Sequence, residues 1–291
     1  MTPEFLTIGH VARDLHVNGS YTVGGTVTFA ALTAHHLGLA AAIVTCADAQ
    51  FMAELPRHLP EIALHIRPSQ HTTTFINQYV EGFRTQYLHA RSADIEQQDI
   101  PEDWRTAPII LLGPLAQELS PDLVQLFPRQ AGHIVAATPQ GWLRRWDSHD
   151  GRVWPTPWSN AEQVLPLLDV LILSHDDLLP FANGERSEAD AILTNWSMQV
   201  PLLVATDGRH GATLFRHGET TRLPAYPALE VDPTGAGDVF AAAFLTHLYR
   251  YKDPEQAVDF ANCVASFSVE QQGILGIPDL SEVSMRLHIQ R

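Results

Sequence analysis

The stretch from Val231 to Leu245 carries the clearest chemical signal in the chain, and it reads Val-Asp-Pro-Thr-Gly-Ala-Gly-Asp-Val-Phe-Ala-Ala-Ala-Phe-Leu. It is a glycine-rich turn that runs into an apolar helix, with Asp238 in the first turn of that helix. Gly235 and Gly237 lack side chains, so backbone N–H groups there can approach a ligand closely. The first N–H groups of a helix have no internal partner and carry positive dipole charge, which favours binding of a phosphate.

A carboxylate beside a phosphate site can accept the proton of a hydroxyl that attacks the phosphate. Asp238, together with the N–H groups of Gly235, Ala236 and Gly237, is therefore a candidate catalytic centre for phosphoryl transfer to an alcohol. The alternative is an ordinary helix start, in which the glycines turn the chain and Asp238 only complements the helix dipole.

The seven residues from Asp232 to Asp238 resemble the D-[TP]-T-G-A-G-D signature of the PfkB, or ribokinase-like, carbohydrate kinases. The resemblance implies an ATP-dependent enzyme that phosphorylates a hydroxyl of a small sugar or cyclitol. It implies that Asp238 is the base and that the glycine turn stabilises the transferred phosphoryl group. ATP and Mg²⁺ are the implied cofactors, and a monovalent cation is a further candidate.

Near the N-terminus, Ile8-Gly9-His10 is followed by Asp14 and then by Gly24-Gly25. This order resembles the first strand of the family, its substrate-binding aspartate and the Gly-Gly pair that opens the first long helix. The resemblance implies that Asp14, with Gly24 and Gly25, binds the acceptor, and a carboxylate can accept hydrogen bonds from adjacent hydroxyls. The alternative for Asp14 is a turn residue at the surface.

Two motifs in the middle of the chain resemble those of the family with one change each. The run from Thr138 to Arg144 is similar to D-P-Q-G-x-L-R, with threonine at the first position and Gln140 as a candidate acceptor ligand. Ser174-x-x-Asp177 stands where the family has the N-x-x-E motif that organises magnesium through water and phosphate. Asp177 is therefore the candidate metal residue, and the alternative is a helix cap at Ser174.

The remaining motifs concern the nucleotide. Thr206, Gly208 and Gly211 match the T-x-G-x-x-G segment that touches nucleotide phosphates and ribose in the family. Thr234 in the glycine turn, and Asn262 on the helix that resembles the one beside the adenine pocket, complete the predicted cofactor-binding set. A buried helix is the alternative for the segment around Asn262.

The acceptor class follows from what the chain lacks. Ribokinase-like members carry Gly-Gly-Lys-Gly-Ala-Asn, whereas this chain has Gly-Gly-Thr-Val-Thr-Phe from Gly24 to Phe29, similar to inositol-kinase-like members. A myo-inositol-like polyol is therefore the favoured acceptor. A nucleoside kinase and a catalytically silent binding protein on the same fold are the alternatives. The polar side chains that could meet a polyol are Asp14, Thr28, Asn77, Gln78, Arg84 and Gln140.

Composition excludes several partners. The formal net charge of −15 argues against nucleic acid and anionic membrane surfaces. Lys252 is the only lysine, and no G-x-x-x-x-G-K-[ST] motif exists, which excludes a Walker-type P-loop. Cys46 and Cys263 lie far apart and suggest neither a disulfide framework nor a zinc site. The chain begins in a strand-like run without a signal peptide, so a cytoplasmic location is expected.

Apolar strand-like runs alternate with helix-like segments along most of the chain. This order predicts an α/β fold: one domain over residues 1–291, with a doubly wound, mostly parallel sheet and helices on both faces. The expected strands are 5–9, 41–46, 108–113, 133–137, 169–173, 201–206 and 212–216. The expected helices are 26–37, 120–127, 161–167, 187–197, 236–250 and 254–270.

Two β-rich pieces, 15–22 and 72–89, interrupt that alternation and predict a small antiparallel flap or lid. Asn18-Gly19 is typical of a two-residue hairpin turn, and Glu81-Gly82 marks the second turn. Because the first hairpin must be short, we expect a monomer rather than a dimer formed through the lid. The stretch 153–158 is expected to be a loop.

Overall fold

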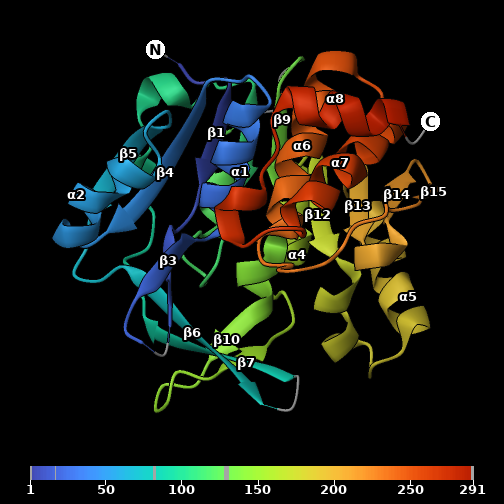
Figure 1. Ribbon diagram of the computed structural model, residues 1–291. Coiled ribbons are helices and arrows are strands. Elements are labelled where there is room, and N and C mark those ends of the chain that lie inside the picture. Colours follow the sequence, from blue (N-terminus) through green and yellow to red (C-terminus); the bar gives the residue numbers. More distant parts are fainter. Residues whose placement is uncertain (1, 17, 81–82, 128–130, 290–291) are drawn as a thin grey trace.

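The computed structural model describes residues 2–16, 18–80, 83–127 and 131–289, and for residues 79, 80, 83 and 84 only the backbone. Within this part a nine-stranded sheet has the order β15-β14-β13-β12-β9-β8-β1-β4-β5 (Figure 1). The strands from β13 to β5 run parallel, and β14 and β15 are antiparallel additions at one edge. The bounds are β1 Phe5–Ile8, β4 Ala41–Ala47, β5 Ala63–Pro68, β8 Ile109–Leu112, β9 Ile134–Ala137, β12 Val170–Ser174, β13 Leu202–Thr206, β14 Ala212–Arg216 and β15 Glu219–Leu223.

Helices cover both faces of this sheet, which explains the continuously apolar central strands. Phe5 and Leu6 are neighbours in β1, both fully buried, and they belong to the two different apolar layers. α1, α2, α6, α7 and α8 pack on one face, and α3, α4 and α5 on the other. The bounds are α1 Thr26–His36, α2 Ala49–His58, α3 Pro121–Val124, α4 Ala161–Val164, α5 Arg186–Ser197, α6 Ala236–Tyr251, α7 Pro254–Ser268 and α8 Leu280–Ile289.

The predicted α/β architecture is confirmed, with differences in single elements. The helix expected over 120–127 is only the short α3. Two helices, α2, which contains Pro56, and α8, were not among the expected helices. Asp48 is the N-cap residue of α2, and its side chain accepts a hydrogen bond from the N–H of Phe51. Aspartate is a preferred N-cap residue, so Asp48 was a signal in the sequence for the start of this helix. No helix of the described residues is long and apolar enough to cross a membrane.

A separate four-stranded sheet, the lid sheet, has the order β3-β2-β6-β7. Its strands are β2 Ala12–Leu15, β3 Tyr21–Gly24, β6 Thr73–Val80 and β7 Phe83–Ala90. The expected antiparallel flap is wrong in one respect, because β2 pairs with β6 in parallel. The two strands within each hairpin pair antiparallel, because a short turn joins them. The parallel pairing joins one hairpin to the other.

The first turn of the lid sheet differs from the expected two-residue turn. Leu15 pairs with Tyr21, and the N–H of His16 donates to the carbonyl of Ser20 at 2.8 Å, so the connection is longer than Asn18-Gly19. The Asn18 side chain accepts a hydrogen bond from the N–H of Ser20 and organises this longer turn. The second expected turn, Glu81-Gly82, lies outside the described residues.

A further hairpin lies against the lid sheet, formed by β10 (Arg144–Trp146) and β11 (Val153–Pro155). The prediction of a loop over 153–158 is therefore wrong for its first three residues, Val153–Pro155, which form a short strand that ends in a proline. Tyr87 of β7 bridges to Arg152, and the N–H of Leu88 donates to the carbonyl of Gly151 at 2.8 Å. The β10–β11 hairpin therefore extends the lid sheet (Figure 1).

Candidate active site

A cavity of about 930 Å³ lies between the lid sheet, the ends of the parallel strands and the start of α6. The segments that follow β9, β12 and β13 line it, which is where an open α/β sheet places its ligands. Most predicted site residues meet there. They are Asp14, Gly25, Gln140, Asp177, Thr206, Gly208, Gly211, Thr234, Gly235, Ala236, Gly237, Asp238 and Asn262.

The start of α6 is built for close approach. Gly235 is the N-cap residue and has φ 80°, a left-handed conformation that favours glycine. A Cβ at this position would lie 2.4–2.6 Å from ring atoms of Phe29, so the ring and the turn fit only because residue 235 is glycine. Gly237 has open space where its Cβ would be. Gly235, Ala236 and Gly237 all line the cavity, as an anion site at a helix N-terminus requires, and the N–H of Ala236 also donates to the carbonyl of Pro233 at 3.2 Å.

Asp238 projects from the first turn of α6 into the same cavity. Burial raises the pKa of its carboxyl to about 6, and the carboxylate of Asp177 adds to the shift, while the Thr26 hydroxyl and the Arg144 guanidinium oppose it. A carboxyl with a pKa near 6 is mostly ionised at neutral pH and is a stronger base than a free aspartate. Such a group is suited to take a proton from an attacking hydroxyl.

Asp177 ends the short 3-10 turn His175–Asp177, whose N-cap residue is Ser174, and its side chain completes the capping box. One of its oxygens accepts the N–H of Ser174 at 3.0 Å, and the Ser174 hydroxyl accepts the N–H of Asp176 at 3.2 Å. The capping alternative is thus what the backbone shows, and the side chain still lines the cavity. Burial raises the pKa of Asp177, and the positive charge of Arg144 opposes this rise.

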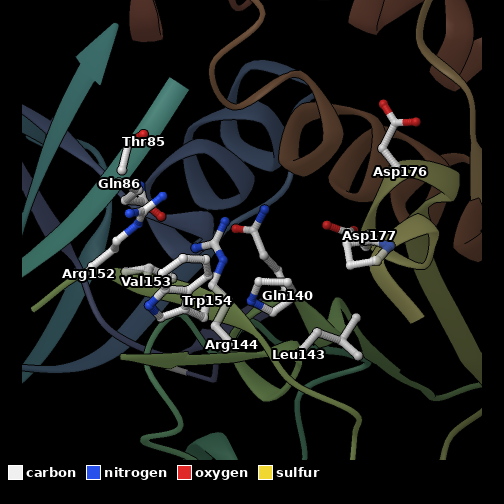
Figure 2. A pocket seen from close by; sticks show the side chains of 12 residues that line it. Thr85, Gln86, Gln140, Leu143, Arg144, Arg152, Val153, Trp154, Asp176 and Asp177 are labelled. Atoms are coloured by element: carbon white, nitrogen blue, oxygen red, sulfur yellow. The ribbon is translucent and has the colours of Figure 1, made fainter. Parts of the chain in front are cut away.

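Arg144 is a further candidate site residue, which belongs to the D-P-Q-G-x-L-R-like run but was not among the predicted site residues. Its charge acts on both Asp177 and Asp238, and its side chain lines the cavity beside Gln140 (Figure 2). A guanidinium whose charge acts on two acidic side chains of an anion site can stabilise charge on a transferring phosphoryl group. The Arg at the end of the D-P-Q-G-x-L-R-like run was the available signal.

Substitution of Arg144 by glutamine is expected to raise the apparent pKa on the acidic limb of the kcat/KM profile by roughly one unit or more, because a nearby positive charge lowers a carboxyl pKa by that order. Initial rates between pH 5 and 8 measure this shift. Arg145→Gln is the matched control, since Arg145 is exposed and lines neither pocket. An unchanged acidic limb in Arg144→Gln would show that Arg144 does not influence the catalytic base.

The acceptor end of the cavity is formed around Asp14. The side-chain amide of Asn77 donates to Asp14 at 3.4 Å, and the amide of Gln86 donates to Asn77 at 3.1 Å. A Cβ on Gly24 would lie 2.4 Å from a carboxylate oxygen of Asp14, so this glycine makes room for the aspartate. Gly25 has φ 95° and is the N-cap of α1. The Gly-Gly pair therefore leaves room for the Asp14 side chain and allows the backbone turn into α1.

The predicted acceptor residues do not all reach the cavity. Thr28 is fully buried and donates its hydroxyl to the carbonyl of Gly24 at 2.8 Å within the helix. Gln78 is exposed and is not among the lining residues, because successive residues of a strand point to opposite faces and Asn77 occupies the inner one. Gly24 and Asn77 act behind Asp14. The side chain of Arg84 lies outside the described part.

The donor end contains the predicted nucleotide residues. Asn262 on α7 donates to the carbonyl of Pro224 at 3.0 Å and fixes the loop that follows β15. Asp232 accepts the N–H of Thr234 at 2.9 Å and that of Gly273 at 3.1 Å, which joins the glycine turn to the loop after α7. Side chains that the sequence analysis did not assign here include Tyr226, which lines this end.

The chemistry of the site suits a magnesium ion held mainly by a polyphosphate. Among the described residues, no three His, Cys, Asp or Glu side chains lie close enough to hold a metal alone. Magnesium commonly keeps several waters and uses one or two carboxylates together with substrate phosphates. Asp177, with Asp176 beside it, supplies that number of carboxylates.

Residues 147–279 match the family model described as pfkB family carbohydrate kinase. The probable fructokinase-5 of Arabidopsis thaliana is 28% identical over 154 residues, which are 50% of this chain and 46% of the relative. The chain thus spans about half the length of the curated relatives it matches. The match confirms the resemblance that the glycine turn indicated.

Solved structures match over nearly the whole chain. A pyrophosphate-dependent kinase in the ribokinase family, complexed with a pyrophosphate analog and myo-inositol, has a TM-score of 0.79 and 22% identity, with 97% of this chain and 99% of that chain covered. The ribokinase of Thermotoga maritima has a TM-score of 0.74 and 21% identity, with 98% and 99% covered. These likenesses confirm the ribokinase-like fold.

Proposed function

We propose that this chain, with the sequence pattern of a PfkB carbohydrate kinase and the ribokinase-like fold, transfers a phosphoryl group from ATP to a hydroxyl of a small sugar or cyclitol. The observation that carries the proposal is the position of Asp238. Its carboxyl, with a pKa raised to about 6, lies at the N–H groups of the glycine turn, in one cavity with Asp14. The proposed base, the proposed anion site and the residue proposed to bind the acceptor thus line the same cavity.

In this mechanism Asp14 and Gln140 orient the acceptor, and Asp238 takes the proton of the attacking hydroxyl. The N–H groups of the glycine turn and the Arg144 guanidinium stabilise charge on the transferring phosphoryl group. Asp177 would hold a magnesium ion through water, and that ion would neutralise charge on the donor phosphates. The lid sheet excludes water, which would otherwise compete as acceptor.

A myo-inositol-like polyol is the favoured neutral acceptor. Phe29 stands where pentose-binding members have a polar residue, and its ring packs against Gly235 at the centre of the site. A solved structure of the same fold contains myo-inositol, which supports this choice for the present chain. Because that protein depends on pyrophosphate, the donor also needs a direct test.

A screen for product release tests the proposal. Cyclitols, pentoses, hexoses and nucleosides are offered with ATP or with pyrophosphate, and ADP or phosphate release is measured against acceptor-free controls. Turnover of a polyol with ATP supports the proposal, and preferred turnover of a nucleoside would replace the acceptor class. Absence of turnover with every donor and acceptor, despite measurable ligand binding, would favour a silent binding protein.

Strain in the turn of the first lid hairpin should weaken binding of the acceptor more than binding of ATP. Gly19 has φ 81° and open space around a would-be Cβ, so Gly19→Val adds backbone strain without a clash. We expect a roughly tenfold higher KM for the acceptor and an unchanged KM for ATP. Gly218→Val is the matched control, since Gly218 has φ 80° and equally open surroundings in another hairpin. Equal losses for both substrates would contradict a lid role.

We further propose that the protein is a monomer in solution. Among the described side chains of the lid sheet, no large hydrophobic residue is exposed, whereas stable interfaces bury about 1,000 Å² or more. Light scattering at micromolar concentration is expected to give the mass of one chain. A stable dimer whose lid strands are protected from hydrogen exchange would refute the monomer. The expected cytoplasmic location stays a prediction.

A further inference from the structure

A second pocket, of about 310 Å³, opens from the acceptor end of the main cavity. The two spaces share five lining residues, so they form one continuous chamber. The shared residues are Gln86, Gln140, Arg144, Asp176 and Asp177. The remaining walls of this side pocket come from β7, from the β10–β11 hairpin, and from Leu143 and Pro180. An acceptor larger than a bare ring could therefore extend from Asp238 into it.

The side pocket has opposite charges at its two ends. Figure 2 shows Arg152 beside Gln86 and Thr85 at one end, and Asp176 with Asp177 at the other. Arg144 and Gln140 lie between the two ends in the same view. The acidic end adjoins the catalytic carboxyl, so the end at Arg152 lies away from the reacting hydroxyl.

The backbone N–H of Arg152 donates to the side chain of Asp150 at 2.8 Å, and no ion pair of the Arg152 guanidinium with a carboxylate is found among the described residues. Its guanidinium lies 4.1 Å from the centre of the Trp154 ring, and its side chain is half-buried. Its backbone is fixed by the bridge to Tyr87, and neighbouring Gly151 is fixed by Leu88. A Cβ on Gly151 would lie 2.4 Å from the Leu88 carbonyl oxygen, so this contact is close. An ordered cation without an ion pair is notable in a chain with a net charge of −15.

We propose that the acceptor carries an anionic group, a carboxylate or a phosphate, and that Arg152 binds it in the side pocket. Guanidinium groups bind both anions through paired, charge-assisted hydrogen bonds. Gln86 and Thr85 supply further polar groups at the same end. This inference rests on the proposed kinase function and narrows its acceptor to acidic sugars or acidic cyclitols.

Binding of the phosphoryl donor does not account for the position of Arg152. None of the predicted nucleotide residues Thr206, Gly208 and Asn262 lines the side pocket, although all three line the main cavity. Arg144, which acts on both Asp238 and Asp177, is the arginine placed to meet the transferred phosphoryl group. Arg152 lies on the far side of Arg144 from Asp177 (Figure 2), in the direction of the lid sheet.

Matched acceptor sets test the inference. Each set pairs a neutral compound with its carboxylate or phosphate relative: glucose with glucuronate and glucose 6-phosphate, and myo-inositol with myo-inositol 1-phosphate. For each compound, kcat/KM is measured by ADP release and Kd by calorimetry with the unlabelled protein. We expect at least one acidic member to exceed its neutral partner by roughly 10- to 100-fold, as for a charge-assisted pair. The carboxylate and phosphate members distinguish the two anions.

The variant Arg152→Gln decides whether that preference comes from Arg152. We expect the acid-to-neutral ratio to fall by roughly the same 10- to 100-fold. Arg145→Gln removes the same charge from an exposed position on the other strand of the hairpin, opposite Trp154, and is expected to keep the ratio. A preference that survives in Arg152→Gln, or falls equally in both variants, would overturn the inference, as would a preference for every neutral member.

The binding measurement separates this inference from the proposed function. If an acidic compound binds in an Arg152-dependent manner but no acceptor is phosphorylated, the anion pocket stands and the kinase proposal fails. If neutral polyols are phosphorylated and no acidic compound shows Arg152-dependent binding, the kinase proposal stands and the anion pocket is refuted.

Discussion

Replacement of Asp238 by asparagine is expected to lower kcat by roughly 10²–10⁴-fold, the range typical of a lost general base. Asparagine keeps the size of the side chain and cannot accept the proton of the attacking hydroxyl. The Kd of ATP should change little, because the N–H groups of the glycine turn remain in place. Steady-state kinetics and calorimetry on the purified variant measure both quantities. Near-normal turnover in Asp238→Asn would exclude Asp238 as the base.

The pH profile of the unmodified enzyme provides a second readout of the same residue. Because the pKa of Asp238 is raised to about 6, kcat/KM should fall as the pH drops below about 6 and should level off above pH 7. The limb should disappear in Asp238→Asn, whose residual activity has no such titrating base. A limb that persists unchanged in the variant would belong to another group.

The same raised pKa has a consequence for stability. A carboxyl whose folded-state pKa lies above its unfolded value destabilises the fold as the pH rises from about 4 to about 6, and the cost then stays constant. Asp238→Asn should therefore melt at a higher temperature than the parent at pH 7, and the difference should shrink toward pH 4. Calorimetric scans across this range check the sign.

Gly235→Ala is expected to lower kcat by roughly 10²–10³-fold, the loss typical of one misplaced oxyanion donor. The left-handed φ of 80° costs a non-glycine residue about 1–3 kcal/mol, and the added Cβ meets the Phe29 ring at 2.4–2.6 Å. Either the ring or the turn must move, and the N–H groups move with the turn. The melting temperature should fall together with the rate.

Gly237→Ala is the control for this substitution. Gly237 is a helical residue with open space around a Cβ, and alanine has a higher helix propensity than glycine. The melting temperature of Gly237→Ala should therefore equal or exceed that of the parent. If Gly235→Ala retained full stability and activity, the close packing of Phe29 against the turn would not be required for the site.

The sequence predicted those parts of the fold that follow from local patterns. Strands such as β1 and β12 are short apolar runs buried on both faces, and α6 begins where the glycine turn ends. The hydrophobic pattern and the positions of turn residues were therefore sufficient to predict these elements. The site residues at strand ends and at the start of α6 were found for the same reason. Their positions are fixed within a few residues of a recognisable motif.

What could not be predicted depends on contacts between distant segments. The parallel pairing of β2 with β6 joins residues about 60 positions apart, and no local pattern encodes it. Thr28 and Gln78 were chosen for polarity, but helix geometry and strand alternation direct them away from the cavity. Arg144 and Arg152 gain their roles only when the β10–β11 hairpin packs beside β7.

The parallel pairing of β2 with β6 also fixes an order of assembly. Between these strands the chain forms α1, β4, α2 and β5, so the lid sheet cannot close until the segments of the main sheet have brought its two hairpins together. Closing a loop of that length costs chain entropy that the few contacts of a small sheet recover only late in folding. The lid sheet therefore cannot fold separately from the main sheet, because a fragment with only one hairpin would leave that hairpin without its parallel partner. During refolding, the strands of the main sheet should gain protection from hydrogen exchange before the strands of the lid sheet do.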